Sequence, residues 1–118
     1  MVTTRAVLVP ATIDPNHAVY GTSTTANVGS TAPAGDGNWG HSDLAGNVWE
    51  WVQDWWAVPY AQTTCTDCAN LTVGGAPYHV LRGGGYTAVS TAFLTTYDRS
   101  TGSDSHYPNT GARCARAK

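Results

Sequence analysis

The stretch Gly46-Asn-Val-Trp-Glu-Trp-Val52 decides the fold of this chain. A glycine stands directly before a run that alternates well enough for a half-buried β-strand. We therefore expect a sharp turn followed by a strand over residues 48–52. Because successive side chains of a strand point to opposite faces, Trp49 and Trp51 share one face and Glu50 lies on the other. We assign both tryptophans to the core.

Two further blocks extend the expected sheet. The first, Val80-Leu-Arg-Gly-Gly-Gly-Tyr86, contains the end of a strand that we place at residues 78–82. Its three glycines end the strand with a backbone freedom that only glycine has. The second, Gly111-Ala-Arg-Cys-Ala-Arg116, predicts a final strand over residues 111–115.

The remaining segments are mostly loops. Residues 22–37 are rich in Thr, Ser, Gly and Ala, residues 57–77 are interrupted by prolines and glycines, and residues 87–105 are polar and irregular. Residues 6–9 predict one edge strand. Since no segment keeps a 3.6-residue apolar period, we expect a loop-rich α+β fold with short antiparallel strands and little helix.

Composition excludes several classes of function. The chain has 118 residues, enough for one domain, and a formal net charge of −2 with 12% charged residues. It lacks a basic run interleaved with aromatic residues, so we expect no nucleic-acid partner. Its apolar run at residues 6–9 is too short for a membrane span or a signal-peptide core. The composition is compatible with an exported bacterial protein and leaves the location open.

In this order and spacing, the three blocks resemble the C-terminal half of the formylglycine-generating-enzyme domain, also called the sulfatase-modifying-factor domain. The resemblance covers about residues 16–116 and implies a C-type-lectin-like fold. Residues 1–15 are then a lead-in segment, and residues 16–118 are a truncated domain of this family. The missing half implies exposed apolar edges, and we expect a homodimer that covers them.

The turn before the first strand suits a calcium ion, which takes roughly six to eight oxygen ligands. The resemblance implies one calcium site here, with side-chain oxygens from Asp43 and Glu50 and main-chain carbonyls from Gly46 and Val48. The alternative is that Glu50 pairs with an arginine and that Asp43 only caps a turn.

The family oxidises a substrate cysteine with two cysteines that hold copper, since soft thiolates suit Cu(I). The resemblance places these positions at Ala88 and Phe93, and it places Gly85 where the family has a serine. Formylglycine generation by that mechanism is therefore not expected. Relatives without the cysteine pair include binding modules, some with a diversified loop. A calcium-stabilised ligand-binding module is the leading hypothesis.

We expect a small-molecule or glycan-like ligand to meet the loop of residues 87–108, whose Thr, Ser, Asp and Tyr side chains suit adaptable hydrogen bonding. Trp55 and Trp56 are adjacent, so one ring is expected to point outward as a stacking platform. Tyr97 and Asp98 complete the candidate ligand-binding set.

The alternative function is a hydrolase of esters or phosphoesters that depends on another divalent metal. Its candidate catalytic residues are His41, Asp43 and Glu50, which could hold a metal ion that activates water. Further ligands would come from the following loop: Asp98, Asp104 or His106.

Cys65 and Cys68 form a CxxC pair, for which a local disulfide, a redox pair and a half-site for zinc are the alternatives. A disulfide is favoured, because the composition resembles that of extracellular proteins. We expect Cys114 to be a buried free thiol in the final strand.

Overall fold

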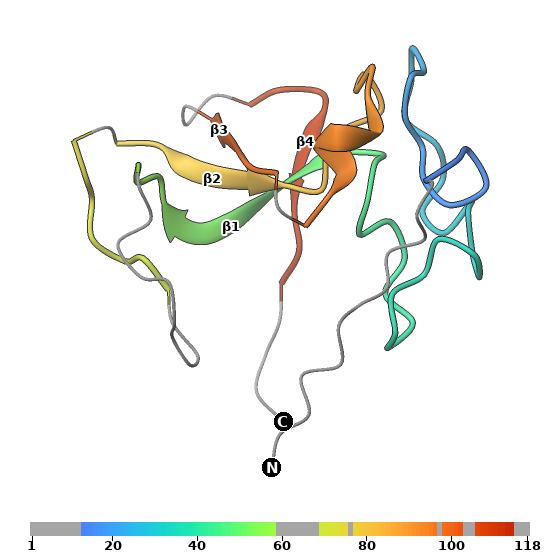
Figure 1. Ribbon diagram of the computed structural model, residues 1–118, viewed down its shortest axis with the longest axis horizontal. Coiled ribbons are helices and arrows are strands. Elements are labelled where there is room, and N and C mark those ends of the chain that lie inside the picture. Colours follow the sequence, from blue (N-terminus) through green and yellow to red (C-terminus); the bar gives the residue numbers. More distant parts are fainter. Residues whose placement is uncertain (1–12, 59–68, 76, 97, 103–105, 115–118) are drawn as a thin grey trace.

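A four-stranded sheet lies at the centre of the computed structural model, which describes residues 13–58, 69–75, 77–96, 98–102 and 106–114. In chain order, the strands are β1 (Trp49–Trp55), β2 (His79–Arg82), β3 (Ser100–Gly102) and β4 (Thr110–Ala112). Their order across the sheet is β3-β2-β1-β4, so the two longest strands occupy the middle (Figure 1). β1, β2 and β4 confirm the three strands predicted at the sequence blocks, whereas residues 6–9 lie outside the described part.

The directions of the strands correct the predicted antiparallel sheet. β2 pairs antiparallel with both β1 and β3, but β4 runs parallel to β1. Parallel neighbours need a crossover connection rather than a hairpin, and here the chain forms β2 and β3 before it returns beside β1. Alternation along a strand is the same in either direction, so the sequence pattern did not reveal this reversal.

The described residues contain no α-helix, and their helical element is a 3₁₀ turn, η1 (Thr91–Leu94). The hydroxyl of Ser90 caps this turn by accepting a hydrogen bond from the amide of Ala92 at 3.2 Å. Both η1 and β3 lie in the segment that we predicted to be irregular. The sequence of β3 is Ser-Thr-Gly, which has no apolar alternation.

Strand pairing confirms the two faces predicted for β1. Trp51 lies opposite Leu81 of β2, and Glu50 lies opposite Arg82. Residues that lie opposite each other on neighbouring strands share a face of the sheet. We call the face that carries the tryptophans the aromatic face, and its aromatic residues are Trp49, Trp51, Trp55 and His79.

The core is small and lies in two places. In β2, at the middle of the sheet, Val80 is fully buried and Leu81 nearly so. A second cluster contains Ala18, Ala88 and Leu94. Trp49 and Trp51, which we assigned to the core, are only half-buried, because two surface hollows open on the face that they share.

The turn before β1 depends on left-handed backbone conformations. The angle φ is 57° at Asp43, 79° at Gly46 and 62° at Asn47. A Cβ atom on Gly46 would lie 2.4 Å from the carbonyl oxygen of Val19, so a larger residue would force the backbone apart. The predicted glycine turn is therefore confirmed.

Asn47 docks the loop-rich residues 13–46 on the sheet. Its amide N–H donates to the carbonyl of Val19, and its carbonyl accepts from the amide of Tyr86, both at 2.8 Å. Its buried side chain bonds both backbone groups of Ala26, at 3.1 and 3.2 Å. Asn47 thus joins residues 19–26 and Tyr86, which are far apart in the sequence, to the turn before β1.

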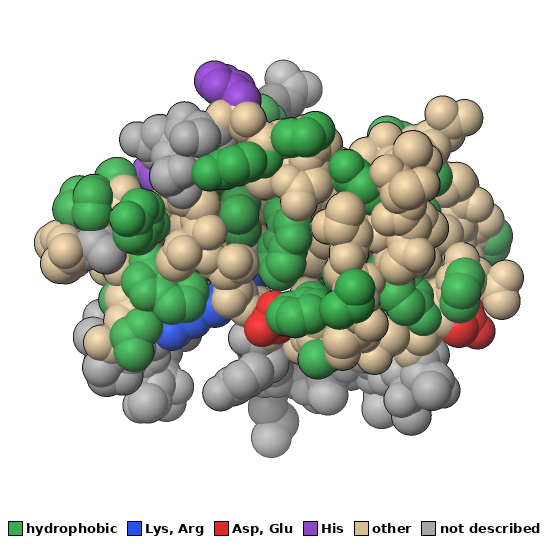
Figure 2. Space-filling view, turned by 90° about the horizontal axis from the view of Figure 1, so that it is seen from above, with side chains coloured by type: hydrophobic (Ala, Val, Ile, Leu, Met, Phe, Trp, Pro, Cys, Tyr) green, Lys and Arg blue, Asp and Glu red, His purple; other side chains and the backbone are tan. Residues whose placement is uncertain are grey.

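Charged side chains are sparse on the surface seen in Figure 2, and hydrophobic ones spread over much of it. Exposed large hydrophobic residues include Val28, Trp39, Val58 and Val89. In the described part of the chain, no helix has the length and apolar character that crossing a lipid bilayer requires.

Candidate functional site

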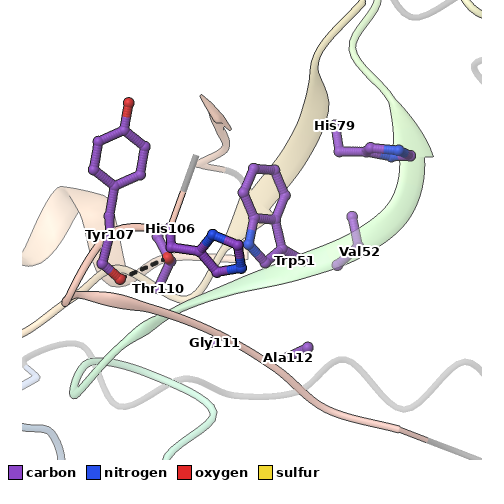
Figure 3. A pocket seen from close by; sticks show the side chains of 8 residues that line it. All are labelled: Trp51, Val52, His79, His106, Tyr107, Thr110, Gly111 and Ala112. Atoms are coloured by element: carbon purple, nitrogen blue, oxygen red, sulfur yellow. Dashed lines mark hydrogen bonds between the residues drawn. The ribbon is translucent and has the colours of Figure 1, made fainter. Parts of the chain in front are cut away.

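A groove of about 550 Å³ opens on the aromatic face of the sheet, beside β1 and β4 (Figure 3). It is lined by Trp51, Val52, His79, His106, Tyr107, Thr110, Gly111 and Ala112. As far as the structure describes it, this lining combines aromatic and imidazole rings with small residues and contains no carboxylate. The groove therefore offers stacking surfaces and hydrogen-bonding groups, which small-molecule sites commonly combine.

Trp51 reaches across the sheet because β3 carries a glycine beneath its ring. A Cβ atom on Gly102 would lie 2.2 Å from Cη2 of Trp51, so the indole rests directly on the backbone there. The ring extends from β1 over β2 to β3 and forms one wall of the groove. The orientation of Trp51 thus depends on the absence of a side chain at Gly102.

His79 lies between two tryptophans of β1. Its imidazole stacks on Trp55, with ring centroids 3.8 Å apart and an interplanar angle of 26°. It meets Trp51 edge-on, at a centroid distance of 6.4 Å. Its Nδ1 atom is buried and has no hydrogen-bond partner among the described residues, and its ring contacts are those with Trp51 and Trp55. These three rings form a continuous aromatic row.

Another part of the groove lining comes from the segment before β4. His106 of this segment is exposed, and its imidazole lines the groove together with the indole of Trp51 (Figure 3). The hydroxyl of Thr110 donates to the carbonyl of Tyr107 at 2.9 Å, and the amide of Thr110 donates to the same oxygen at 3.1 Å. This turn fixes the backbone that carries Tyr107 into the groove lining.

A second hollow of about 260 Å³ shares Tyr107 and Thr110 with the groove. Its other lining residues are Trp49, Leu81, Ser100, Thr101, Gly102 and Asn109. The aromatic face therefore carries two adjoining hollows, both bordered by the turn that precedes β4.

The predicted stacking platform lies elsewhere on the sheet. One face of the Trp55 ring is covered by His79, and the guanidinium carbon of Arg99 lies 4.5 Å from the centre of the Trp56 ring. Both indoles are half-buried. The carbonyl of Asp98 accepts from Arg82 at 2.8 Å, and Tyr97 lies outside the described residues. The structure thus joins Trp55 to the groove through His79, and Trp55, Trp56 and Asp98 are not among the described residues of its lining.

The two positions that hold copper cysteines in the family carry no sulfur here. Ala88 is buried, and Phe93 is an exposed residue of η1. At Gly85 an added Cβ atom would lie 2.9 Å from Cδ1 of Trp49, so this indole packs directly against the backbone. Cys65 and Cys68, with the predicted disulfide, lie outside the described residues.

Cys114 has no disulfide partner among the described residues, and it is exposed, which corrects the expected burial of this thiol. The reason is that β4 ends at Ala112, earlier than the predicted strand end at residue 115. Cys114 consequently lies beyond the sheet rather than within it.

Next to the turn before β1, Glu50 pairs with an arginine. This pairing is the alternative that the sequence left open beside a calcium site. The guanidinium of Arg113 bonds both carboxylate oxygens of Glu50, with a shortest distance of 2.6 Å. It also donates to the carbonyl of Ser42 at 2.9 Å and reaches that of Asp43 at 3.4 Å. The hydrogen bond from Arg113 to Glu50 raises the pKa of the guanidinium above its ordinary value.

Asp43 holds the same turn by a different contact. Its Oδ2 atom accepts a hydrogen bond from the amide of Gly29 at 2.9 Å. With Glu50 engaged by a guanidinium, this donor set does not fit a divalent cation as it is arranged. Calcium at Asp43, Gly46, Val48 and Glu50 stays a prediction.

The candidate hydrolase site is not assembled in the described part of the chain. No three His, Cys, Asp or Glu side chains gather there in a group that could hold a metal ion. His41 is exposed, and Glu50 is committed to Arg113. The hydrolase alternative therefore stays a prediction that the described geometry does not support.

His79 was not predicted as a site residue, whereas His106 and Tyr107 lie in the loop of residues 87–108 that was expected to meet a ligand. We treated the histidines as isolated, because none shares helical spacing with another. One signal was available for His79: it lies two residues before Leu81 in a predicted strand, so a sheet places both on one face. The composition of the loop marked the region of His106 and Tyr107, but their position beside Trp51 was not predicted, since only the return of β4 beside β1 brings them there.

Comparisons with known proteins relate this chain to one family. Residues 12–118 match the sulfatase-modifying factor enzyme 1-like domain, FGE-sulfatase. Over 104 residues the chain is 38% identical to the formylglycine-generating enzyme of Streptomyces coelicolor, covering 85% of this chain and 32% of that protein.

A solved structure is similar as well. Treponema denticola variable protein 1 aligns with a TM-score of 0.66 and 28% sequence identity, over 82% of this chain and 34% of that chain. The chain thus spans about a third of the length of both relatives.

Proposed function

We propose that this chain, which belongs to the sulfatase-modifying factor enzyme 1-like domain family, is a ligand-binding module. Its ligand is a sugar ring held in the groove on the aromatic face. The observation that carries the proposal is the groove of about 550 Å³ beside Trp51, with His79 and His106 in its lining.

The chemistry of the lining suits a carbohydrate. A sugar ring has an apolar face of C–H groups, which packs on an indole, and a rim of hydroxyls, which need hydrogen-bond partners when they are buried. Trp51 supplies the first surface, and the exposed imidazole of His106 supplies a hydrogen-bond donor and an acceptor. The lectin-like fold implied by the resemblance is consistent with this use.

We do not propose formylglycine generation for this chain, although the relative from Streptomyces coelicolor is named a formylglycine-generating enzyme. The copper-holding positions are Ala88 and Phe93, and neither side chain binds Cu(I). Cys114 is exposed beyond β4. Fold alone does not transfer an activity when its reacting groups are missing.

The proposal is tested by screening the purified chain against an array of mono- and oligosaccharides, followed by calorimetric titration of each hit. We expect His106→Ala to weaken binding of the best hit about 2- to 10-fold, since one hydrogen bond contributes roughly 0.5–1.5 kcal/mol. His106 is exposed, so its replacement should leave the fold intact.

The matched control is His41→Ala, which removes another exposed histidine outside the groove lining. Its affinity should equal that of the unmodified chain. Equal losses in both variants, or an array without any hit, would remove the carbohydrate proposal.

A further inference from the structure

Arg113 lies where a carboxylate and two main-chain carbonyls of the turn before β1 converge. Its guanidinium contacts Glu50, Ser42 and Asp43. Carboxylates and carbonyls are also the oxygen types that calcium takes from proteins. The positive charge beside the Glu50 carboxylate is therefore supplied by the chain itself, through Arg113.

The pairing of β4 with β1 brings the guanidinium of Arg113 to Glu50. Glu50 of β1 lies opposite Gly111 of β4 in the parallel pairing. Arg113 follows Gly111 by two residues, and side chains two residues apart in an extended segment lie on the same face. The planar guanidinium suits a two-point contact with a carboxylate, which a lysine ammonium cannot reproduce.

A second cation on Glu50 would meet strong repulsion. A divalent ion bound to this carboxylate would lie within a few ångströms of the guanidinium, and like charges at that separation repel. The carboxylate is only partly exposed, with 21% of its side-chain surface accessible, so solvent screens this repulsion incompletely. The two cations therefore exclude each other at Glu50.

We infer that Arg113 is the resident cation of this turn and that a divalent ion can replace it only when the guanidinium is removed. The chain then folds without calcium, in contrast to what the family resemblance implies. This inference is independent of the groove and of its ligand.

Thermal unfolding tests the inference. For the unmodified chain, we expect Tm to differ by no more than about 2 °C between 1 mM EDTA and 5 mM calcium chloride at matched ionic strength, because saturating binding would shift it more. For Arg113→Gln, we expect a lower Tm in EDTA and a recovery of about 5 °C or more in calcium.

Arg82→Gln is the matched control. Arg82 lies opposite Glu50 on the same face, but its guanidinium bonds the carbonyls of Thr96 and Asp98 instead. This variant should lose stability equally in EDTA and in calcium. Arg113→Lys keeps the positive charge but loses the two-point contact with the carboxylate. The Tm of this variant should remain insensitive to calcium.

Two results would overturn the inference. The first is a Tm of the unmodified chain that rises by 5 °C or more with calcium. The second is an Arg113→Gln chain whose Tm does not respond. Should Arg113→Gln fail to fold, calcium titration of Arg113→Lys decides, since tight calcium binding there would show that the cations do not exclude each other.

Discussion

At the scale of single residues, small side chains decide where large ones lie. The Trp51 indole lies on β3 because Gly102 leaves its backbone bare, and Trp49 packs on Gly85 for the same reason. The groove wall at Trp51 is therefore as dependent on a glycine as on the tryptophan itself. We accordingly expect Gly102 to be more sensitive to substitution than its position in a three-residue edge strand suggests.

Gly102→Ala tests this dependence. The added methyl would overlap Trp51, and overpacking of this kind costs about 1–3 kcal/mol of stability. We expect a lower Tm and a changed tryptophan fluorescence spectrum. Gly75→Ala is the control, since an added Cβ there meets nothing within 4 Å. Equal Tm values for the two variants would contradict the packing described here.

Asp14 gives a prediction on pH. The hydrogen bond from His17 at 2.7 Å, followed by that from the amide of Asn16, lowers the pKa of the Asp14 carboxyl. A lowered folded-state pKa means that the contribution to stability is complete above the ordinary pKa of aspartate and is lost as the pH falls through the folded-state value. NMR titration of the carboxyl should show a midpoint below the ordinary value, and His17→Ala should raise it. An unchanged midpoint in that variant would argue against the pair.

At the scale of elements, the turn before β1 and the sheet depend on Asn47. Its φ of 62° suits asparagine or glycine, and its side chain bonds both backbone groups of Ala26. Asn47→Gly should destabilise the chain by about 1–3 kcal/mol, the cost of leaving buried polar groups unpaired. Asn47→Ala should cost about 1 kcal/mol more, because alanine adds the strain of a positive φ. Urea unfolding measures both, and equal losses would show that φ contributes nothing.

The sequence predicted the elements whose signals are local. The glycine turn at Gly46 and the two faces of β1 follow from residue type and alternation, and both are confirmed. β3 could not be found, because Ser-Thr-Gly has no pattern of its own and becomes a strand only through pairing with β2. The parallel direction of β4 is equally non-local, since the path of the intervening chain sets it.

At the scale of the whole molecule, the family could be predicted, whereas the groove could be predicted only in part, through the loop that carries His106 and Tyr107. Three blocks in order were sufficient for the family, which matches residues 12–118. The groove requires Trp51, His79 and His106 from three separate segments to meet. Their meeting depends on the return of β4, which no single segment of the sequence encodes.

The expected homodimer stays a prediction at this scale. Exposed hydrophobic residues such as Val28, Trp39 and Val89 give an association surface something to bury. Sedimentation equilibrium at micromolar concentration should give twice the mass of 12.4 kDa. A single species at the monomer mass would contradict it.

The most direct test of the groove is an NMR titration that observes the indole N–H signals of the five tryptophans with the best carbohydrate hit. If the aromatic face binds the ligand, the signal of Trp51 shifts with increasing ligand, and that of Trp39, which is 85% exposed and lies outside the groove lining, stays in place. A shift at Trp39 with Trp51 unmoved would place the ligand elsewhere and contradict the proposed function.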